Sequence, residues 1–356
     1  MGSSKIKIFK DTILNFLLRE EYSLSYVIES ADWTIKRIGK YITDNLNKSN
    51  LIKSRITTSC FALKNQIVHF GSVHTFIKES GYHKLHKSNK SILTWFHFVS
   101  KDQKNKKIIE AQNHIDFIHT ASSITKNNLI NLGVKSEKIV VIPLGVDLSL
   151  FKRVPLSEKQ NMRNKLNIPL DKIVIGSFQK DGVGWNEGLK PKLVKGPDIL
   201  IEVLKQLVKH YPIYILLTGP ARGYVKNRLN NLKIPYNSIG YFKNFSEISQ
   251  YYHALDLYLI TSRIEGGPKQ ILEAWASGVP VVSTEVGMVF DIARNKENIL
   301  MAEIESIEEI IKNVEKIIED KILRERLIKN GLEEVKKYSW ENITKKYYND
   351  IYIKLI

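Results

Sequence analysis

Hydrophobic and polar residues alternate along the chain in two different periods, and each period marks one type of element. From about residue 140 onward, short apolar runs rich in β-branched residues predict strands at 139–142, 173–175, 214–217, 257–260 and 279–282. Between these runs, segments such as 198–210 and 306–318 carry apolar residues every three or four positions, which predicts amphipathic helices. Strands that alternate with helices of this length indicate a parallel sheet covered on both faces.

The helical patterns predict which side chains face the core. The expected core-facing stripes are Leu200, Val203, Leu204, Leu207 and Val208 in the first helix and Ile307, Ile310, Ile311, Val314, Ile317 and Ile318 in the second. Ser306 and Glu309 have the spacing of a capping box at the start of the second helix. A last helix over 339–356 begins with a serine cap and places Ile343, Tyr347, Ile351 and Leu355 on one face.

The first part of the chain alternates less regularly, with expected strands at 23–29, 55–59, 66–70, 92–98 and 117–121. In the segment 143–147, a Gly and an Asp close a strand, and a polar stretch follows this segment. We therefore place a domain boundary near Arg153. The predicted organisation is an N-terminal domain over 1–153, a second over 154–338, and a helix over 339–356 that crosses back to the first. Ligands of such α/β proteins bind in clefts at strand ends.

Composition narrows the class of protein only partly. A chain of 356 residues exceeds one ordinary hydrophobic core, which supports two domains. The 54 Lys and Arg against 37 Asp and Glu give a net charge of +17, which attracts nucleic acid, anionic lipid or phosphorylated small molecules without choosing among them. No apolar run approaches bilayer length, and the N-terminus lacks a secretory pattern. The single cysteine, Cys60, lies in an apolar setting and suggests a buried thiol in a cytoplasmic protein.

The segment 262–284 is the most informative about chemistry. A strand ends near Thr261, a Gly-Gly turn follows, and Pro268 stands where a first helical residue belongs. The helix is expected to run to Gly278, so its N-terminus points backbone N–H groups at a site suited to phosphate. Two carboxylates, Glu265 and Glu273, stand around it, and carboxylates suit ribose and sugar hydroxyls. Phosphate, ribose and sugar groups together indicate a nucleotide-sugar.

This segment resembles the glycosyltransferase family 4 (group-one) enzymes of GT-B fold. Their pattern of Glu, seven residues, Glu, then Ala-x-Ala-x-Gly-x-Pro-Val-Val is matched by Glu265, Glu273, Ala274, Ala276, Gly278, Pro280, Val281 and Val282. Ile-Pro-x-Gly-Val-Asp is matched at 142–147, and Lys-Gly-x-Asp at 195–198. The resemblance implies an α/β GT-B fold, with two Rossmann-like domains whose parallel sheets face a central cleft.

The resemblance also implies roles for individual residues. Glu273 would hold the ribose hydroxyls, Glu265 would contact the transferred sugar, and Lys195 would neutralise charge on the leaving diphosphate. The donor would also be surrounded by Gly219, Gly266, Gly267, Pro268 and Lys269. Family members often carry an Arg after the first strand of this domain; here Ser177 follows Gly176, and we expect Lys180 to substitute. His97, at the end of the strand over 92–98, is either a core residue or a catalytic, sugar-contacting one.

The resulting prediction is a retaining, metal-independent glycosyltransferase that moves a hexose-type sugar from a nucleotide-sugar to a saccharide or lipid-linked acceptor in surface polysaccharide or glycoconjugate synthesis. No Asp-x-Asp or Cys/His cluster suggests a metal, and no cofactor besides the donor is expected. Two alternatives stay open: a GT-B protein of other chemistry, such as a nucleotide-sugar epimerase or phosphorylase, and a non-catalytic basic protein that binds nucleic acid. We expect no nucleic-acid partner, because no platform of interleaved aromatic and basic residues supports one.

The N-terminus has a pattern of its own. Residues 5–19 predict a basic amphipathic helix with Ile6, Phe9, Ile13, Phe16 and Leu17 on one side and Lys5, Lys7, Lys10 and Arg19 flanking it. Such a helix can lie on an anionic membrane surface, although packing against the first domain is the commoner outcome. The predicted location is therefore the cytoplasm, with peripheral contact at the inner face of the membrane as an option.

Overall fold

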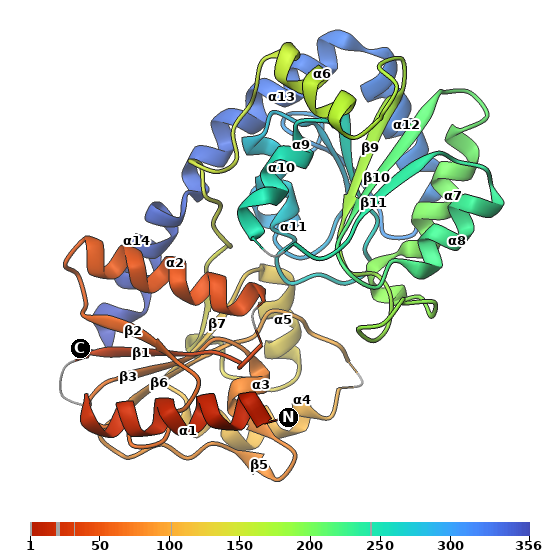
Figure 1. Cartoon of the computed structure of the whole chain (residues 1–356). Helices are drawn as coiled ribbons and strands as arrows, with labels where there is room; N and C mark the ends of the chain where they lie inside the picture. The colour runs from red at the N-terminus through yellow and green to blue at the C-terminus, as the bar shows by residue number, and fades with distance from the viewer. Residues whose placement is uncertain (1, 19–21, 32, 101, 243) are drawn as a thin grey trace. The chain divides into compact units, whose positions relative to one another are not determined.

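The computed structural model describes residues 2–18, 22–31, 33–100, 102–242 and 244–356. The chain forms two compact units (Figure 1). Unit 1 consists of Met1–Leu144 with Trp340–Ile356, and unit 2 of Gly145–Ser339. Each unit contains a six-stranded sheet whose strands all pair in parallel. The predicted α/β class with two parallel sheets is confirmed.

Unit 1 has the strand order β2-β1-β3-β6-β7-β8. These strands are β1 (Leu24–Val27), β2 (Ser54–Thr57), β3 (Ile67–Phe70), β6 (Lys90–Thr94), β7 (Phe117–Thr120) and β8 (Ile139–Val141), and a small hairpin pairs β4 (Ile77–Lys78) with β5 (Gly81–Tyr82). The helices are α1 (Gly2–Leu17), α2 (Thr34–Lys48), α3 (Val73–Phe76), α4 (Lys104–Ala111), α5 (Ser123–Asn131) and α14 (Trp340–Asp350). Helix α14, from the end of the chain, packs against α2, which in turn covers β1 and β2.

Unit 2 has the strand order β11-β10-β9-β12-β13-β14. These strands are β9 (Ile173–Phe178), β10 (Ile213–Thr218), β11 (Tyr236–Ile239), β12 (Leu257–Ile260), β13 (Val281–Thr284) and β14 (Leu300–Ala302). The helices are α6 (Leu156–Lys165), α7 (Pro197–Leu207), α8 (Gly223–Asn231), α9 (Ile248–Tyr252), α10 (Gln270–Ala276), α11 (Val289–Ile292), α12 (Ile307–Glu319) and α13 (Lys321–Val335). The order reverses between β9 and β12, where doubly wound sheets bind ligands at the carboxyl ends of the strands.

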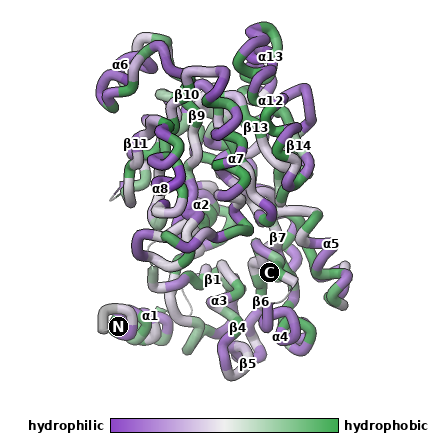
Figure 2. The backbone as a smooth tube through the Cα atoms, turned by 90° about the vertical axis from the view of Figure 1, so that its right-hand side faces the viewer, coloured by the Kyte–Doolittle hydropathy of each residue, from purple (hydrophilic) through white to green (hydrophobic). Residues whose placement is uncertain are grey.

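The predicted helical stripes form the core of unit 2. Leu200, Val203, Leu204 and Leu207 of α7 and Ile310, Val314 and Ile317 of α12 are buried in one cluster with residues of β9 and β10. The apolar strand residues appear green in the middle of the sheet, and the covering helices alternate green and purple (Figure 2). Burial of these faces supplies the main driving force for folding of the unit.

Several local predictions need correction. The strand expected over 92–98 ends at Thr94, and β11 and β14 were missed because each is short and carries polar residues or a weak pattern. Ser306 makes no side-chain cap; Glu309 accepts a hydrogen bond from the backbone of Glu303 instead, so the capping-box prediction is wrong. Cys60 is buried as expected, and burial raises the pKa of its thiol to about 11. None of the described helices combines the length and apolar character required to cross a bilayer.

Two buried histidines join the sheet of unit 1 to the end of the chain. His69 Nδ1 lies 2.8 Å from the Tyr352 hydroxyl, and its Nε2 lies 2.8 Å from Thr94 Oγ1. His119 Nε2 lies 2.9 Å from the Tyr347 hydroxyl. Burial lowers the pKa of both histidines, that of His119 to about 4, so both stay neutral near pH 7. These contacts give the C-terminal segment a polar as well as an apolar attachment.

The low pKa of His119 predicts a pH dependence of stability. The unfolded chain takes up a proton at an ordinary histidine pKa of about 6.5, whereas the folded chain resists protonation down to about 4. Stability is therefore fully present above pH 6.5 and falls as pH drops towards 4, on the order of 3 kcal/mol from this residue. In urea titrations at several pH values, His119→Gln should flatten this slope, whereas His86→Gln, at an exposed position, should not. An unchanged slope in His119→Gln would refute the assignment.

Candidate donor site at the β9–β12 crossover

Two loops meet at the carboxyl ends of β9 and β12. The loop after β12 donates backbone hydrogen bonds from Arg263 N and Ile264 N to the carbonyl of Val194, at 2.9 and 3.0 Å. Thr261 Oγ1 donates to the carbonyl of Gly196 at 2.8 Å. The segment before α7 and the segment after β12 are thus held together at the point where the strand order reverses.

Gly196 makes this approach sterically feasible. Its φ of +62° lies in the left-handed region, and a Cβ atom there would stand 1.8 Å from the carbonyl oxygen of Thr261. Pro197 then opens α7. Asp198 receives two hydrogen bonds of 2.8 Å from the guanidinium of Arg263, which lowers the pKa of its carboxyl. In the Lys-Gly-x-Asp sequence, Gly196 and Asp198 thus each fix one part of the junction between the segment before α7 and the segment after β12.

Lys195 and Glu265 form an ion pair at this junction. Lys195 Nζ donates to both oxygens of Glu265, at 2.6 and 2.7 Å, and Ser262 Oγ donates to the same carboxylate at 2.9 Å. The two side chains are only 17% and 7% exposed. A partly desolvated ion pair interacts more strongly than a surface ion pair. The structure thus brings two predicted catalytic residues into direct contact.

Glu273 is buried on α10 and is also paired with a lysine. It accepts a hydrogen bond of 2.5 Å from Lys269 Nζ and one of 2.8 Å from the Tyr252 hydroxyl. Lys269 Nζ also lies 4.1 Å from the centre of the Phe245 ring. Burial, and then the charge of Glu273, raise the pKa of Tyr252 well above its usual value, so its hydroxyl remains a donor.

The turn before α10 differs from the prediction. The helix begins at Gln270, two residues after Pro268, and has seven residues, so Pro268 is not its first residue and its dipole is that of a short helix. Gly278 does end it, with φ of +69°. Gly266 is buried and its carbonyl accepts from Met288 N at 3.1 Å, while Gly267 is half-buried. The predicted donor loop is therefore held by the 287–288 turn on one side and α10 on the other.

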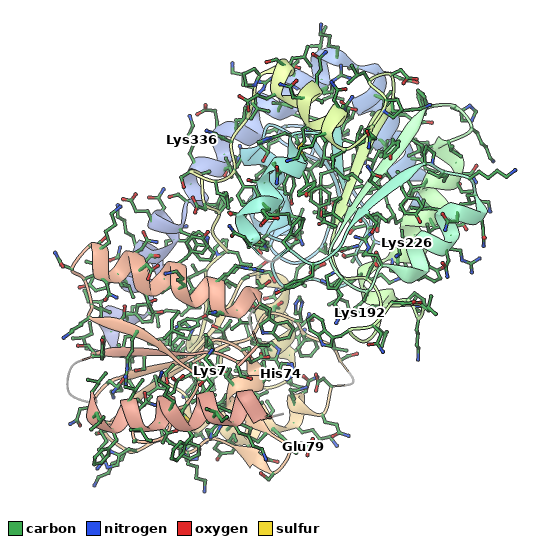
Figure 3. All side chains as sticks on the ribbon, in the orientation of Figure 1. Lys7, His74, Glu79, Lys192, Lys226 and Lys336 are labelled. Carbon is green, nitrogen blue, oxygen red and sulfur yellow. The ribbon has the colours of Figure 1, made fainter. Side chains whose placement is uncertain are left out.

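Two further lysines, Lys180 and Lys192, lie on the segment between β9 and α7 that also carries Lys195. Burial lowers the pKa of Lys192, and Lys195 and Lys180 lower it further while Glu265 opposes them. Lys192 is labelled on the loop that precedes α7 (Figure 3). Lys180 lies with its Nζ 3.6 Å from the centre of the Trp185 ring, and burial lowers its pKa. Lys195 is therefore bonded to Glu265, Lys192 lies close enough to interact with both charges, and Lys180 interacts with Lys192.

Arg222 holds the loop that carries Lys180. Its Nη1 donates to the carbonyls of Ser177 and Gln179 at 2.6 and 3.0 Å, and its Nε lies 3.0 Å from Asp181 Oδ1. Gly219 has φ of +99°, and a Cβ there would approach Gln179 O to 2.9 Å. Gly219, predicted to contact the donor, is thus required by backbone packing of the same loop.

His97 belongs to unit 1. It follows β6 in an exposed loop instead of ending a strand, and its carbonyl accepts a hydrogen bond of 3.0 Å from Trp95 Nε1. The alternative that it is a buried core residue is therefore wrong.

Sequence patterns missed four residues that shape the site. Ser262, Tyr252, Arg222 and Lys192 belong to no motif that we used, and the first three act by side-chain contacts with residues 3 to 45 positions away. Ser262, three residues before Glu265, and Lys192, in a lysine-rich run, carried a weak local signal. Tyr252 comes from α9, and only the tertiary fold brings it to Glu273.

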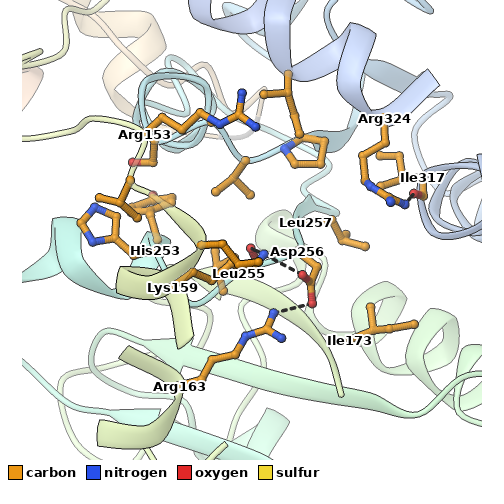
Figure 4. A pocket seen from close by; sticks show the side chains of 18 of the residues that line it. Arg153, Lys159, Arg163, Ile173, His253, Leu255, Asp256, Leu257, Ile317 and Arg324 are labelled. Atoms are coloured by element: carbon orange, nitrogen blue, oxygen red, sulfur yellow. Dashed lines mark hydrogen bonds and ion pairs between the residues drawn. The ribbon is translucent and has the colours of Figure 1, made fainter. Parts of the chain in front are cut away.

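A separate cavity of about 510 Å³ lies at the opposite, amino edge of the unit 2 sheet. Asp256 at this edge accepts hydrogen bonds from Lys159 and Arg163, at 2.7 and 2.6 Å (Figure 4). Burial of Asp256 favours a higher pKa of its carboxyl, but these two cations outweigh burial and hold the pKa below the usual value. The cations are satisfied by the protein itself, which indicates a structural role. Lys195, Glu265 and Glu273 do not line this cavity, although Tyr252, the hydrogen-bond partner of Glu273, does.

The strand order of unit 2, which reverses between β9 and β12, defines a Rossmann-like class of α/β domain. Comparison with known proteins gives the family. Residues 190–334 match the family of glycosyl transferases group 1. This stretch of unit 2 is thus similar to that family, and the resemblance seen in the sequence is confirmed.

Individual relatives agree with this family. An uncharacterised glycosyltransferase of Haemophilus influenzae is 31% identical over 128 residues, which are 35% of this chain and 36% of that protein. The N,N'-diacetylbacillosaminyl-diphospho-undecaprenol alpha-1,3-N-acetylgalactosaminyltransferase of Campylobacter jejuni is 25% identical over 67% of this chain and 61% of its own. The alignments thus span less than two thirds of either relative.

A crystal structure of Anabaena HepE with UDP and glucose matches the fold. It has a TM-score of 0.73 at 16% identity and covers 93% of this chain and 99% of its own. At this identity the likeness establishes the fold, and the GT-B fold class is confirmed.

The close packing at Gly196 leads to a prediction. Gly196→Ala should separate the two loops, because its Cβ would overlap the Thr261 carbonyl, and should destabilise unit 2 by more than about 1 kcal/mol. The control is Gly240→Ala, at an exposed glycine around which a Cβ would meet no atom within 4 Å. Thermal unfolding monitored by circular dichroism should show a loss for the first variant only. Equal stability of the two variants would contradict the role given to Gly196.

Proposed function

We propose that the protein is a retaining, metal-independent glycosyltransferase that moves a hexose-type sugar from a nucleotide-sugar to a saccharide or lipid-linked acceptor. The ion pair of Lys195 and Glu265 at the β9–β12 crossover carries this proposal, because it lies inside the stretch that matches the glycosyltransferase family. The Campylobacter relative is named for an acceptor carried on diphospho-undecaprenol, which supports a lipid-linked acceptor in surface glycoconjugate synthesis.

The charges of the site suit the leaving group of such a reaction. When the bond between the sugar and the diphosphate breaks, negative charge grows on the diphosphate oxygens. Preorganised cations that face this charge stabilise the transition state. Lys195, Lys192 and Lys180 supply three ammonium groups, and burial makes a charged Lys192 and Lys180 costly until an anion arrives. These lysines take the part that a divalent metal has in other transferases.

The two carboxylates have different proposed tasks. Glu273 lies deep on α10, where Tyr252 and Lys269 fix its orientation, and it would accept hydrogen bonds from the ribose hydroxyls. Each carboxylate oxygen has a second lone pair, so the existing contacts leave acceptor capacity. Glu265 would contact the transferred sugar, and its ion pair with Lys195 would matter most as charge develops on the leaving diphosphate. We further place the enzyme in the cytoplasm at the inner face of the membrane.

Binding of the donor without metal provides the first test. A panel of nucleotide-sugars and free sugars is added to the protein in EDTA, and the unfolding temperature is measured. We expect one nucleotide-sugar to stabilise the protein, by an amount that grows with the logarithm of its concentration, and free sugars to have no effect. Nucleoside diphosphate should then be released when an acceptor is added, equally in EDTA and in magnesium. Stabilisation or turnover that requires magnesium would overturn the cationic account.

Variants in which glutamine replaces glutamate, and so removes the negative charge, separate the roles of the two glutamates. Glu273→Gln should weaken the binding of the nucleoside diphosphate by roughly ten- to a hundredfold, the usual range for loss of a charged hydrogen bond. Glu265→Gln should leave that affinity within about twofold but lower kcat, because its contact strengthens as charge develops. Calorimetric titration and steady-state kinetics measure the two effects.

A matched control comes from the same unit. Glu334 is also buried and paired with cations, Arg294 and Lys337, outside the donor site. Glu334→Gln should change neither affinity nor kcat, whatever it does to stability. If Glu273→Gln binds the nucleoside diphosphate like the parent protein, the ribose assignment is wrong.

A further inference from the structure

Helix α1 contacts unit 1 through its polar side. Asp11 accepts hydrogen bonds from the backbone N–H and the hydroxyl of Thr58, at 2.8 and 2.6 Å. Asn15, which is fully buried, donates to the carbonyls of Ser59 and Phe61 at 2.8 and 3.1 Å. The side of α1 that faces the protein therefore carries buried polar contacts, beside the less exposed Ile8 and Leu14 (38% and 37% exposed).

The opposite side of α1 is apolar and exposed. Its large side chains are Ile6 (69% exposed), Phe9 (68%), Ile13 (46%), Phe16 (61%) and Leu17 (67%). At 3.6 residues per turn these positions form one continuous stripe. Phe61, whose carbonyl is bonded to Asn15, extends the apolar surface with a side chain that is 59% exposed. A contiguous surface of this kind marks a site of interaction.

Positive charge borders the apolar stripe. Lys5 and Lys10 are exposed, and at 100° per residue they lie on opposite edges of the stripe. Asp11, the acidic residue in the sequence of α1, is turned inward to Thr58. Lys64 is exposed in the loop that carries Phe61. Of the four basic residues predicted to flank the helix, Lys7 is half-buried, and Arg19 lies outside the described residues.

We propose that the outer face of α1 docks on an anionic lipid bilayer, with the helix parallel to the membrane plane. Its aliphatic and phenylalanine side chains would enter the boundary between headgroups and acyl chains, while Lys5 and Lys10 reach the lipid phosphates. The exposed face of α1 offers cations at both edges, which matches the negative potential of such a surface.

Charge also argues against a second copy of the chain as the occupant. A two-fold pair of α1 helices would place the same surface on both sides of the interface. The lysines along both margins would then face lysines, because Asp11 is turned inward and bonded to Thr58. Like charges at an interface disfavour association, whereas lipid phosphates neutralise them.

The docking surface deepens the proposed transfer to a lipid-linked acceptor, because it would hold unit 1 at the surface where such an acceptor lies. It depends on α1 alone, and donor binding depends on unit 2. Failure of one proposal can therefore be told from failure of the other.

A matched pair of substitutions tests the surface. Ile6→Asp places a charge within the apolar stripe, and Ile322→Asp makes the same change at an 83% exposed position of α13. The full chain is sedimented with vesicles of phosphatidylcholine alone or of phosphatidylcholine with phosphatidylglycerol. We expect the parent and Ile322→Asp to bind the anionic vesicles, and Ile6→Asp to bind roughly tenfold less or weaker.

Other outcomes are equally decisive. No binding of the parent to anionic vesicles, or equal binding of both variants, would overturn the proposal. A parent dimer in light scattering that Ile6→Asp converts to a monomer would assign the stripe to a second copy instead. Circular dichroism should show that both variants are folded, and calorimetry with the nucleoside diphosphate should give both the affinity of the parent.

Discussion

The close approach of the segments before α7 and after β12 is the constraint on which the candidate site depends. The sheet brings β9 and β12 side by side, but their pairing at 257–258 ends before the two segments meet, so further contacts must join the segments. Backbone hydrogen bonds to Val194, the close contact at Gly196 and the Arg263–Asp198 pair hold them. Because of this junction, Lys195 meets Glu265 although the two residues are 70 positions apart.

The junction also explains how the site tolerates so much charge. Each of the two buried glutamates has a lysine within hydrogen-bond distance, which compensates for the loss of water around the carboxylate. Lys192 lies close enough to one of these pairs to interact with its charges, and burial lowers the pKa of Lys192 and of Lys180. A carboxylate-bound lysine is already oriented and immobile, so its charge needs little rearrangement when an anion arrives.

Sequence could predict the parts of this arrangement that depend on spacing and on backbone rules. Periodicity located α7 and α12, and the motif residues Lys195, Gly196, Glu265 and Glu273 fall where two segments must fit closely. The capping of Ser306 and the start of α10 were wrong because competing contacts of Glu309 and the turn at Pro268 decide them. Tyr252 and Arg222 were missed because their partners are distant in the chain, and local patterns carry no information about such contacts.

The division of unit 1 between the two ends of the chain has a consequence for synthesis. A ribosome makes the strands of unit 1 first and the segment Trp340–Ile356 only after all of unit 2. Until Tyr347 and Tyr352 emerge, His119 and His69 lack the hydroxyl partners that they have in the finished structure. Unit 2 can therefore complete its sheet on the nascent chain before unit 1 acquires the helix that packs on α2.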